Sequence, residues 1–172
     1  MRTLHVDRYF KLLSLVEEAI GNNQFETAVR YSREGIQLVP DVIAETIEEY
    51  GSFNIVASPV VERGAMLLAL AGDRSGLETL RNNLACIPPE NPLWVVTNEW
   101  LKATDLIENV LARVTKKPGI HQLDLRDEFA SNVHEKFREV CYWLARTGKI
   151  NRKRSGRSYA LWPTASDGRI RQ

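Results

Sequence analysis

The sequence has few cysteines and no long apolar segment. None of its runs approaches the roughly 18 apolar residues that a membrane-spanning helix needs. Residues 1–8 mix charged and polar side chains instead of leading into the apolar core of a signal peptide. Cys86 and Cys141 lie in apolar helical patterns, with no second cysteine or clustered histidine at metal-ligand spacing. We therefore expect a cytoplasmic protein with no membrane contact, no disulfide and no metal site.

Known catalytic motifs are also missing from the sequence. It contains no glycine-rich phosphate loop, no Gly-x-Ser-x-Gly segment and no His-Glu-x-x-His segment. His121 with Asp124 and Asp127 is the one grouping that suits a metal or acid–base site, and a short helix with exposed acidic residues explains it more simply. We therefore expect no enzyme activity and no cofactor.

Acidic and basic residues are distributed unevenly along the chain. The total charge is close to neutral, but residues 1–112 carry 9 Lys and Arg against 16 Asp and Glu, a balance of −7. Residues 113–172 carry 14 basic against 6 acidic residues, a balance of +8. Such a split is typical of a protein in which one part binds a polyanion and the other does not, although a solvated face can show the same imbalance.

The first half of the chain has apolar residues at helical spacing, interrupted by turn-forming residues. The pattern predicts helices before and after residues 21–23, a short helix over 42–50, one over about 59–71, and another that runs from 72 to Pro88. The helix after residues 21–23 matches the second half of a tetratricopeptide repeat, in which aromatic, small and apolar residues precede a terminating proline: Phe25, Ala28, Gly35, Ile36, Leu38 and Pro40.

Residues 1–90 therefore resemble tetratricopeptide repeats. A weaker copy of the motif ends at Pro89, 49 residues after Pro40, which exceeds the usual period of about 34. The resemblance implies a domain of paired antiparallel helices that ends its first repeat at Pro40, and a generic helical bundle is the alternative. Residues 91–117 predict a long connecting helix, with Asn91 as its cap and Pro92 at its first position.

Residues 118–163 predict a second, smaller domain. A short extended segment at Ile120 is followed by a short helix, a turn at residues 131–132, and a third helix that ends at Gly148. We expect Asn132 to cap this third helix together with Glu135. An apolar stripe marks the buried side of the helix: Phe137, Val140, Cys141 and Leu144. A β-hairpin with a turn at Ser155-Gly156 completes the domain, and residues 164–172 form a flexible tail.

This order of elements resembles the winged helix-turn-helix family, with the end of the third helix reading Leu-Ala-Arg-Thr-Gly-Lys-Ile over residues 144–150. The fold expected is thus mainly α: a tetratricopeptide-like helical bundle followed by a winged-helix domain. The resemblance implies that the third helix enters the major groove of DNA and that the wing lies along the backbone or enters the minor groove. The matching positions are Asn132, His134, Lys136 and Arg138 in the helix and Arg152, Lys153, Arg154 and Arg157 in the wing.

The wing itself gives a physical reason to expect nucleic acid. Residues 151–158 contain four cations, three short polar side chains and no acid. Cations that reach phosphates release condensed counterions, so such a segment provides affinity that falls with salt and carries little sequence information. We expect all four cations to surround the hairpin tip, so that replacing them abolishes binding with little change in stability. A solvated hairpin tip is the alternative.

The third helix differs from the wing in the charge of its outer face. Its outer face carries Glu135 and Glu139, which repel phosphate but can accept hydrogen bonds from cytosine in the major groove. The sequence thus predicts a DNA-binding regulator of transcription or replication, associated with the nucleoid when bound to duplex DNA. Its helical repeats would bind a protein partner or form a homodimer. The alternatives are a protein-assembly module whose winged helix packs on protein, and an accessory factor that binds RNA.

Overall fold

The computed structural model describes residues 4–51 and 58–164; the predicted tail lies outside the described residues except for Thr164. The protein is mainly helical, with a small three-stranded antiparallel sheet near its C-terminal end. The chain forms two compact units, Met1–Thr104 and Asp105–Gln172. No described helix is both long and apolar enough to span a membrane.

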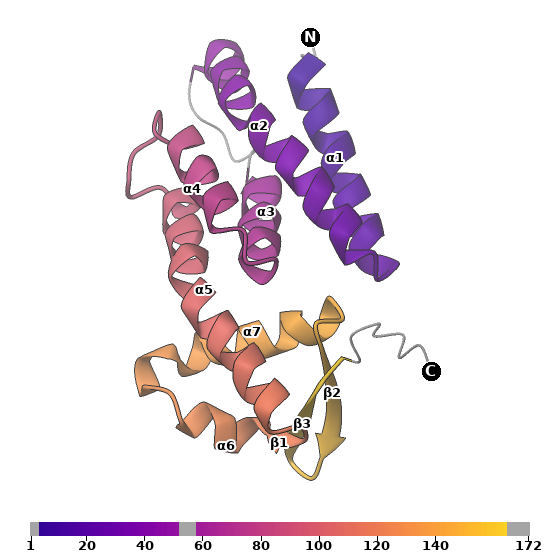
Figure 1. Ribbon diagram of the computed structural model, residues 1–172. Coiled ribbons are helices and arrows are strands. Elements are labelled where there is room, and N and C mark those ends of the chain that lie inside the picture. The colour runs from indigo at the N-terminus through magenta and orange to yellow at the C-terminus, as the bar shows by residue number, and fades with distance from the viewer. Residues whose placement is uncertain (1–3, 52–57, 165–172) are drawn as a thin grey trace. The chain divides into compact units, whose positions relative to one another are not determined.

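The first unit contains α1, α2, α3, α4 and the first part of α5 (Figure 1). Their bounds are Leu4–Gly21, Phe25–Tyr50, Ser58–Leu70, Arg74–Asn83 and Pro92–Lys116. Helix α2 packs against α1, α3 and α4, so its side chains form the centre of this unit. The breaks predicted at residues 21–23 and 72–73 are confirmed, and so is the helix predicted over about 59–71.

Helix α2 does not end at Pro40. It continues without a break to Tyr50, so the separate helix predicted over 42–50 is wrong, and the tetratricopeptide position assigned to Pro40 does not terminate a repeat. Proline has no N–H to give to the carbonyl four residues earlier, which is that of Ile36. The Nδ2 atom of Asn83 donates to this carbonyl oxygen instead, at 3.0 Å. A side chain from α4 therefore replaces the hydrogen bond that the proline removes.

Of the helix boundaries predicted for α4 and α5, the end of α4 is wrong and the start of α5 is confirmed. The Oδ1 atom of Asp73 accepts a hydrogen bond from the Gly76 N–H at 2.9 Å, which caps α4. This helix ends at Asn83, before the predicted end at Pro88. At the start of α5 the side chain of Asn91 accepts from the Leu93 N–H at 3.0 Å, so the predicted cap is confirmed.

The second unit contains the rest of α5 and six short elements (Figure 1). These are β1 (Ile120–His121), α6 (Gln122–Asp127), the 3₁₀ turn η2 (Ser131–Val133), α7 (His134–Arg146), β2 (Ile150–Ser155) and β3 (Ser158–Pro163). Strand β3 lies between β1 and β2 and is antiparallel to both. The extended segment predicted at Ile120 is confirmed, and it forms the third strand of the sheet beside the predicted hairpin.

The predicted apolar stripe of α7 is confirmed as the core of this unit. All four of its residues are buried, together with Leu125 of α6 and with Ile150 and Leu161 of the hairpin. The rings of Phe129 and Phe137 lie 5.5 Å apart between their centroids. The core thus joins α6 and α7 to one face of the sheet. The stripe gives α7 one apolar side, and every second residue of a hairpin strand points to the same face of the sheet.

Asn132 does not cap α7, contrary to the prediction. The residue before the helix is Val133, and no side chain makes a cap hydrogen bond there. Asn132 lies inside η2, where the Val133 N–H bonds to the Ala130 carbonyl at 3.1 Å. The 3₁₀ turn leads directly into α7, so a backbone turn takes the place of a side-chain cap.

We predict that Leu144→Ala lowers the free energy of unfolding by about 2–5 kcal/mol, because the side chain is fully buried and its loss leaves a cavity. Urea denaturation followed by circular dichroism measures this change. Arg146→Ala, an exposed position on the same helix, is the control and should change stability by less than about 0.5 kcal/mol. Equal denaturation midpoints for the two variants would contradict the proposed core.

A second prediction concerns Pro40. Asn83→Ala should cost about 1–2 kcal/mol of stability, because it leaves the Ile36 carbonyl without its side-chain donor. In a Pro40→Ala background the same change should cost less, because alanine at that position restores the N–H that the carbonyl lacks. A double-mutant cycle with urea denaturation measures the difference. Additive effects of the two substitutions would show that Asn83 does not compensate for the proline.

Candidate nucleic-acid interface

The hairpin of β2 and β3, here called the wing, has a two-residue turn. Ser155 pairs with Ser158, so the turn consists of Gly156 and Arg157, one residue later than predicted. Gly156 has φ +59°. Turns of this kind join tightly twisted strands and need glycine where φ is positive. The turn therefore places Arg157 at the tip of the wing.

Arg152 does not belong to the tip, contrary to the prediction. It pairs with Leu161 in the middle of the hairpin, and opposite residues share a face of the sheet, so it lies on the face of the buried Leu161. Its Nε atom donates to Oε1 of Gln122 at 2.9 Å. Its guanidinium lies 3.6 Å from the centre of the Tyr159 ring. Arg152 is therefore a half-buried anchor between α6 and the wing.

The other three wing cations are exposed. Arg154 and Arg157 have no ion-pair partner among the residues that the structure describes, and the Nζ atom of Lys153 lies 5.9 Å from the centre of the Trp162 ring. Because Lys153 and Arg154 are neighbours on one strand, they point to opposite faces of the sheet. The three cations thus present positive charge on both sides of the wing and at its tip.

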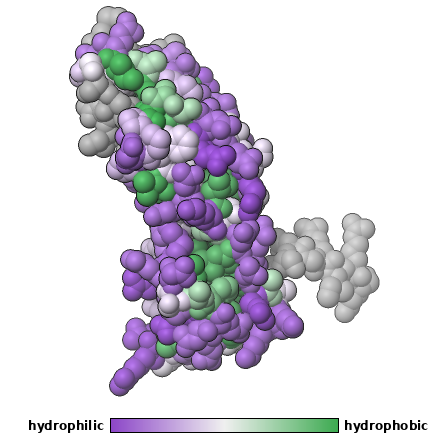
Figure 2. Space-filling view, turned by 90° about the vertical axis from the view of Figure 1, so that its left-hand side faces the viewer, coloured by the Kyte–Doolittle hydropathy of each residue, from purple (hydrophilic) through white to green (hydrophobic). Residues whose placement is uncertain are grey.

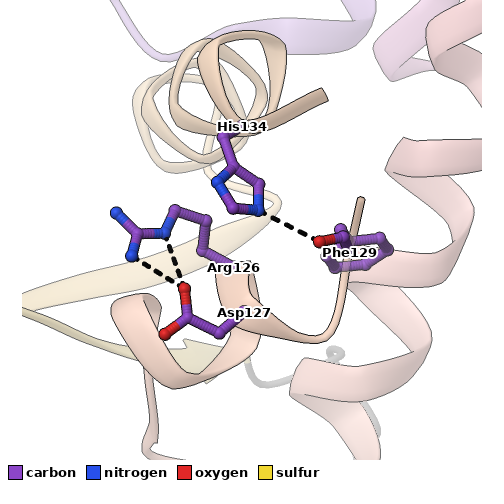
Figure 3. Close-up of polar contacts among 4 residues, drawn as sticks. All are labelled: Arg126, Asp127, Phe129 and His134. Atoms are coloured by element: carbon purple, nitrogen blue, oxygen red, sulfur yellow. Dashed lines mark hydrogen bonds and ion pairs between the residues drawn. The ribbon is translucent and has the colours of Figure 1, made fainter. Parts of the chain in front are cut away.

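Two of the helix residues predicted to bind DNA are tied to local partners. His134 is the first residue of α7, and its Nε2 atom lies 3.0 Å from the carbonyl oxygen of Phe129, across the turn from α6 (Figure 3). The same view shows Arg126 paired with Asp127 at the end of α6. Lys136 donates to Oε2 of Glu139 at 2.7 Å. His134 and Lys136 therefore help to fix the start of α7.

The remaining predicted helix residues, Asn132 and Arg138, are exposed. Arg138 lies beside a shallow groove of about 400 Å³ between α7 and β2, together with Glu135, Glu139, Tyr142 and Arg152. Two acids and two guanidinium groups share this groove. It can offer hydrogen-bond acceptors as well as donors to a ligand, unlike the tip of the wing, which offers donors and positive charge.

Cys141 lies in the core of α7. Burial raises the pKa of its thiol to about 12, and the nearby positive charge of Arg152 offsets part of this rise. A thiol with such a pKa stays protonated at neutral pH and is a poor nucleophile or metal ligand. Cys141 therefore contributes to packing, as its place in the apolar stripe indicated.

One residue of the site was not predicted. Gln122 is buried and holds Arg152, and no local pattern in the sequence links these positions. Outside the site, Trp162 of β3 is 41% exposed and does not belong to the buried core. Neighbouring residues of a strand point to opposite faces, so the position of Trp162 directly after the apolar Leu161 was a signal that places Trp162 on the outer face.

Searches against protein-family models, curated proteins and solved structures found no match.

We predict that Arg152→Ala lowers the free energy of unfolding by about 1–3 kcal/mol, because it removes a charge-assisted hydrogen bond and a cation–π contact. Arg152→Lys should not restore stability, since lysine lacks the planar group that reaches both partners. Lys153→Ala, at the next and exposed position, is the matched control and should be nearly neutral. The measurement is urea denaturation, and equal effects at 152 and 153 would rule out the anchoring role.

Proposed function

We propose that this protein binds duplex DNA through the wing and α7, as a regulator of transcription or replication. The observation that carries the proposal is the exposure of Lys153, Arg154 and Arg157 on a hairpin with a two-residue turn. Neither strand of this hairpin contains an acidic residue. The order of elements from α5 to β3 is helix, strand, helix, helix and hairpin. This order supports the resemblance to winged-helix domains.

The wing suits the phosphate backbone better than it suits base edges. Its exposed cations lie on an antiparallel hairpin that Arg152 anchors to α6 from the middle of β2. Each cation that neutralises a phosphate releases counterions, so binding should be strong at low salt and weak at high salt. Contacts of this kind position the protein on DNA without reading sequence.

Helix α7 carries the candidate base-reading residues. Glu139 is paired with Lys136 at 2.7 Å, so a positive charge lies beside one of the two acids on its outer face. This pairing lowers the repulsion from phosphate that two unpaired glutamates would produce. Glu135 and Arg138 remain exposed, and in the major groove they suit cytosine N4 and guanine O6 and N7 respectively.

The helical unit is proposed to contact a protein partner or a second copy of the chain. Phe10, Ile47 and Tyr50 of α1 and α2 are at least 42% exposed. Figure 2 shows hydrophobic residues in separate patches among hydrophilic ones on one face of the protein. Scattered apolar residues of this kind are ordinary on protein surfaces, so the homodimer stays a prediction that the mass in solution would check.

The test of DNA binding is a wing variant in which Lys153, Arg154 and Arg157 are all replaced by alanine. We expect it to fold like the wild type and to lose most of its affinity for a short mixed-sequence duplex. The slope of log K against log salt should flatten by up to about 2.7, at roughly 0.9 per phosphate contact. Fluorescence anisotropy at several salt concentrations measures both quantities.

A matched control removes three exposed cations of the helical unit: Arg8, Lys11 and Lys102. This variant has the same net charge as the wing variant, so it separates a local contact from a general charge effect. We expect it to keep the wild-type slope. Unchanged affinity and slope in the wing variant would overturn the proposal and favour the assembly module. Much tighter binding of the wild type to structured RNA would favour the RNA-binding alternative.

A further inference from the structure

The sheet of the second unit has an outer face that the core does not use. Ile120 and Leu161, which pair with each other, are buried and define the inner face. Neighbouring residues of a strand point to opposite faces, so Ala160 and Trp162 of β3 lie on the outer one. Trp162 is 41% exposed. An indole ring on this face contributes little to the core beneath the sheet.

The neighbours of Ala160 shape this outer face. In the strand register Ala160 lies opposite His121 of β1 on one side and Lys153 of β2 on the other. Residues opposite one another share a face, so two larger side chains flank a methyl group next to Trp162. The His121 ring is held by a contact of 3.2 Å between its Nε2 atom and the Ser155 carbonyl oxygen. The outer face around Ala160 thus carries an imidazole ring on the β1 side, a lysine on the β2 side and the Trp162 indole two residues further along β3.

Gly119 sets the position of the Trp162 ring. A Cβ atom at residue 119 would lie 2.9 Å from Cζ2 and 3.0 Å from Cη2 of the indole. Gly119 also has φ +82°, which favours glycine. The indole therefore lies against bare backbone and is held in place on that side, while a large part of its surface stays open to solvent.

The charge of the outer face favours an anionic ligand. Its described residues are His121 of β1, Asn151, Lys153 and Ser155 of β2, and Ser158, Ala160 and Trp162 of β3, and this set contains no acid. The Lys153 Nζ atom lies 5.9 Å from the centre of the indole. A flexible lysine at this distance can contact the phosphate of a nucleotide whose base stacks on the ring.

We infer that the outer face of the sheet binds unpaired nucleotides, with a base stacked on Trp162 and Lys153 on its phosphate, and this rests on the proposed DNA binding. Aromatic side chains beside cations bind single strands with little sequence preference, because every base has a π-face. The protein should therefore prefer a duplex that continues into a single strand over a fully paired duplex. The natural target would be a DNA end, a gap or an opened region.

The test compares a blunt duplex with the same duplex carrying a short single-stranded thymidine extension. We expect the wild type to bind the extended duplex more tightly, by roughly 5- to 150-fold for one stacked base. Trp162→Leu should remove this preference and leave affinity for the blunt duplex nearly unchanged, whereas Trp162→Phe, which keeps an aromatic face, should retain most of it. Thermal melting of each variant checks that the sheet is folded.

A second measurement uses the wild type, so it does not depend on the folding of a variant. With 5-iodouracil in the extension, irradiation should cross-link the DNA to the peptide that contains Trp162, as mass spectrometry can show. Equal affinity for the two duplexes, a preference that survives in Trp162→Leu, or a cross-link confined to other residues would each overturn the inference. Failure of the wild type to bind the blunt duplex would instead overturn the proposed function.

Discussion

The pairing of β3 on both of its edges is the constraint on which the second unit depends. Because β3 bonds to β1 and to β2, its alternation fixes the two faces of the whole sheet. Leu161 points into the core formed with α6 and α7, and Trp162 points away from it. Adjacent residues of β3 thus face the hydrophobic core on one side of the sheet and the candidate nucleic-acid surface on the other.

Alternation along β2 and distance from the core together divide the basic residues of the wing into two roles. Arg152 faces inward, where Gln122 and Tyr159 hold it, and its positive charge stabilises the fold. Lys153 faces outward, and Arg154 and Arg157 continue towards the tip, where they remain exposed. A cluster of cations that looks uniform in the sequence therefore has one structural member and three that are available to a ligand.

Local sequence patterns were sufficient for most of the fold. The apolar stripe of α7 and the cap at Asn91 each depend on residues close together in the chain, and each is confirmed. The assignment of the helical unit to tetratricopeptide repeats and of the second unit to winged helices stays a prediction. So does the binding of DNA.

Two of the errors share a physical cause, which is compensation by a partner that is distant in the sequence. Pro40 ends a helix in most contexts, but Asn83, 47 positions after Ile36, satisfies the carbonyl that the proline leaves free. Arg152 would be exposed on an isolated hairpin, but Gln122, 30 positions earlier, binds it. Asn132 has the right chemistry for a cap, but the backbone turn of η2 already leads into α7.

The tight turn at Gly156 and Arg157 has a consequence for how this domain can change in evolution. With two residues in the turn and both strands fully paired, the wing has no slack to absorb a shift in register. One residue inserted into β2 between Lys153 and the turn would turn Arg152 outward and bring Lys153 to the core side of the sheet. Length is therefore more strongly constrained than composition in this segment, and related chains should differ there by substitution and seldom by insertion or deletion.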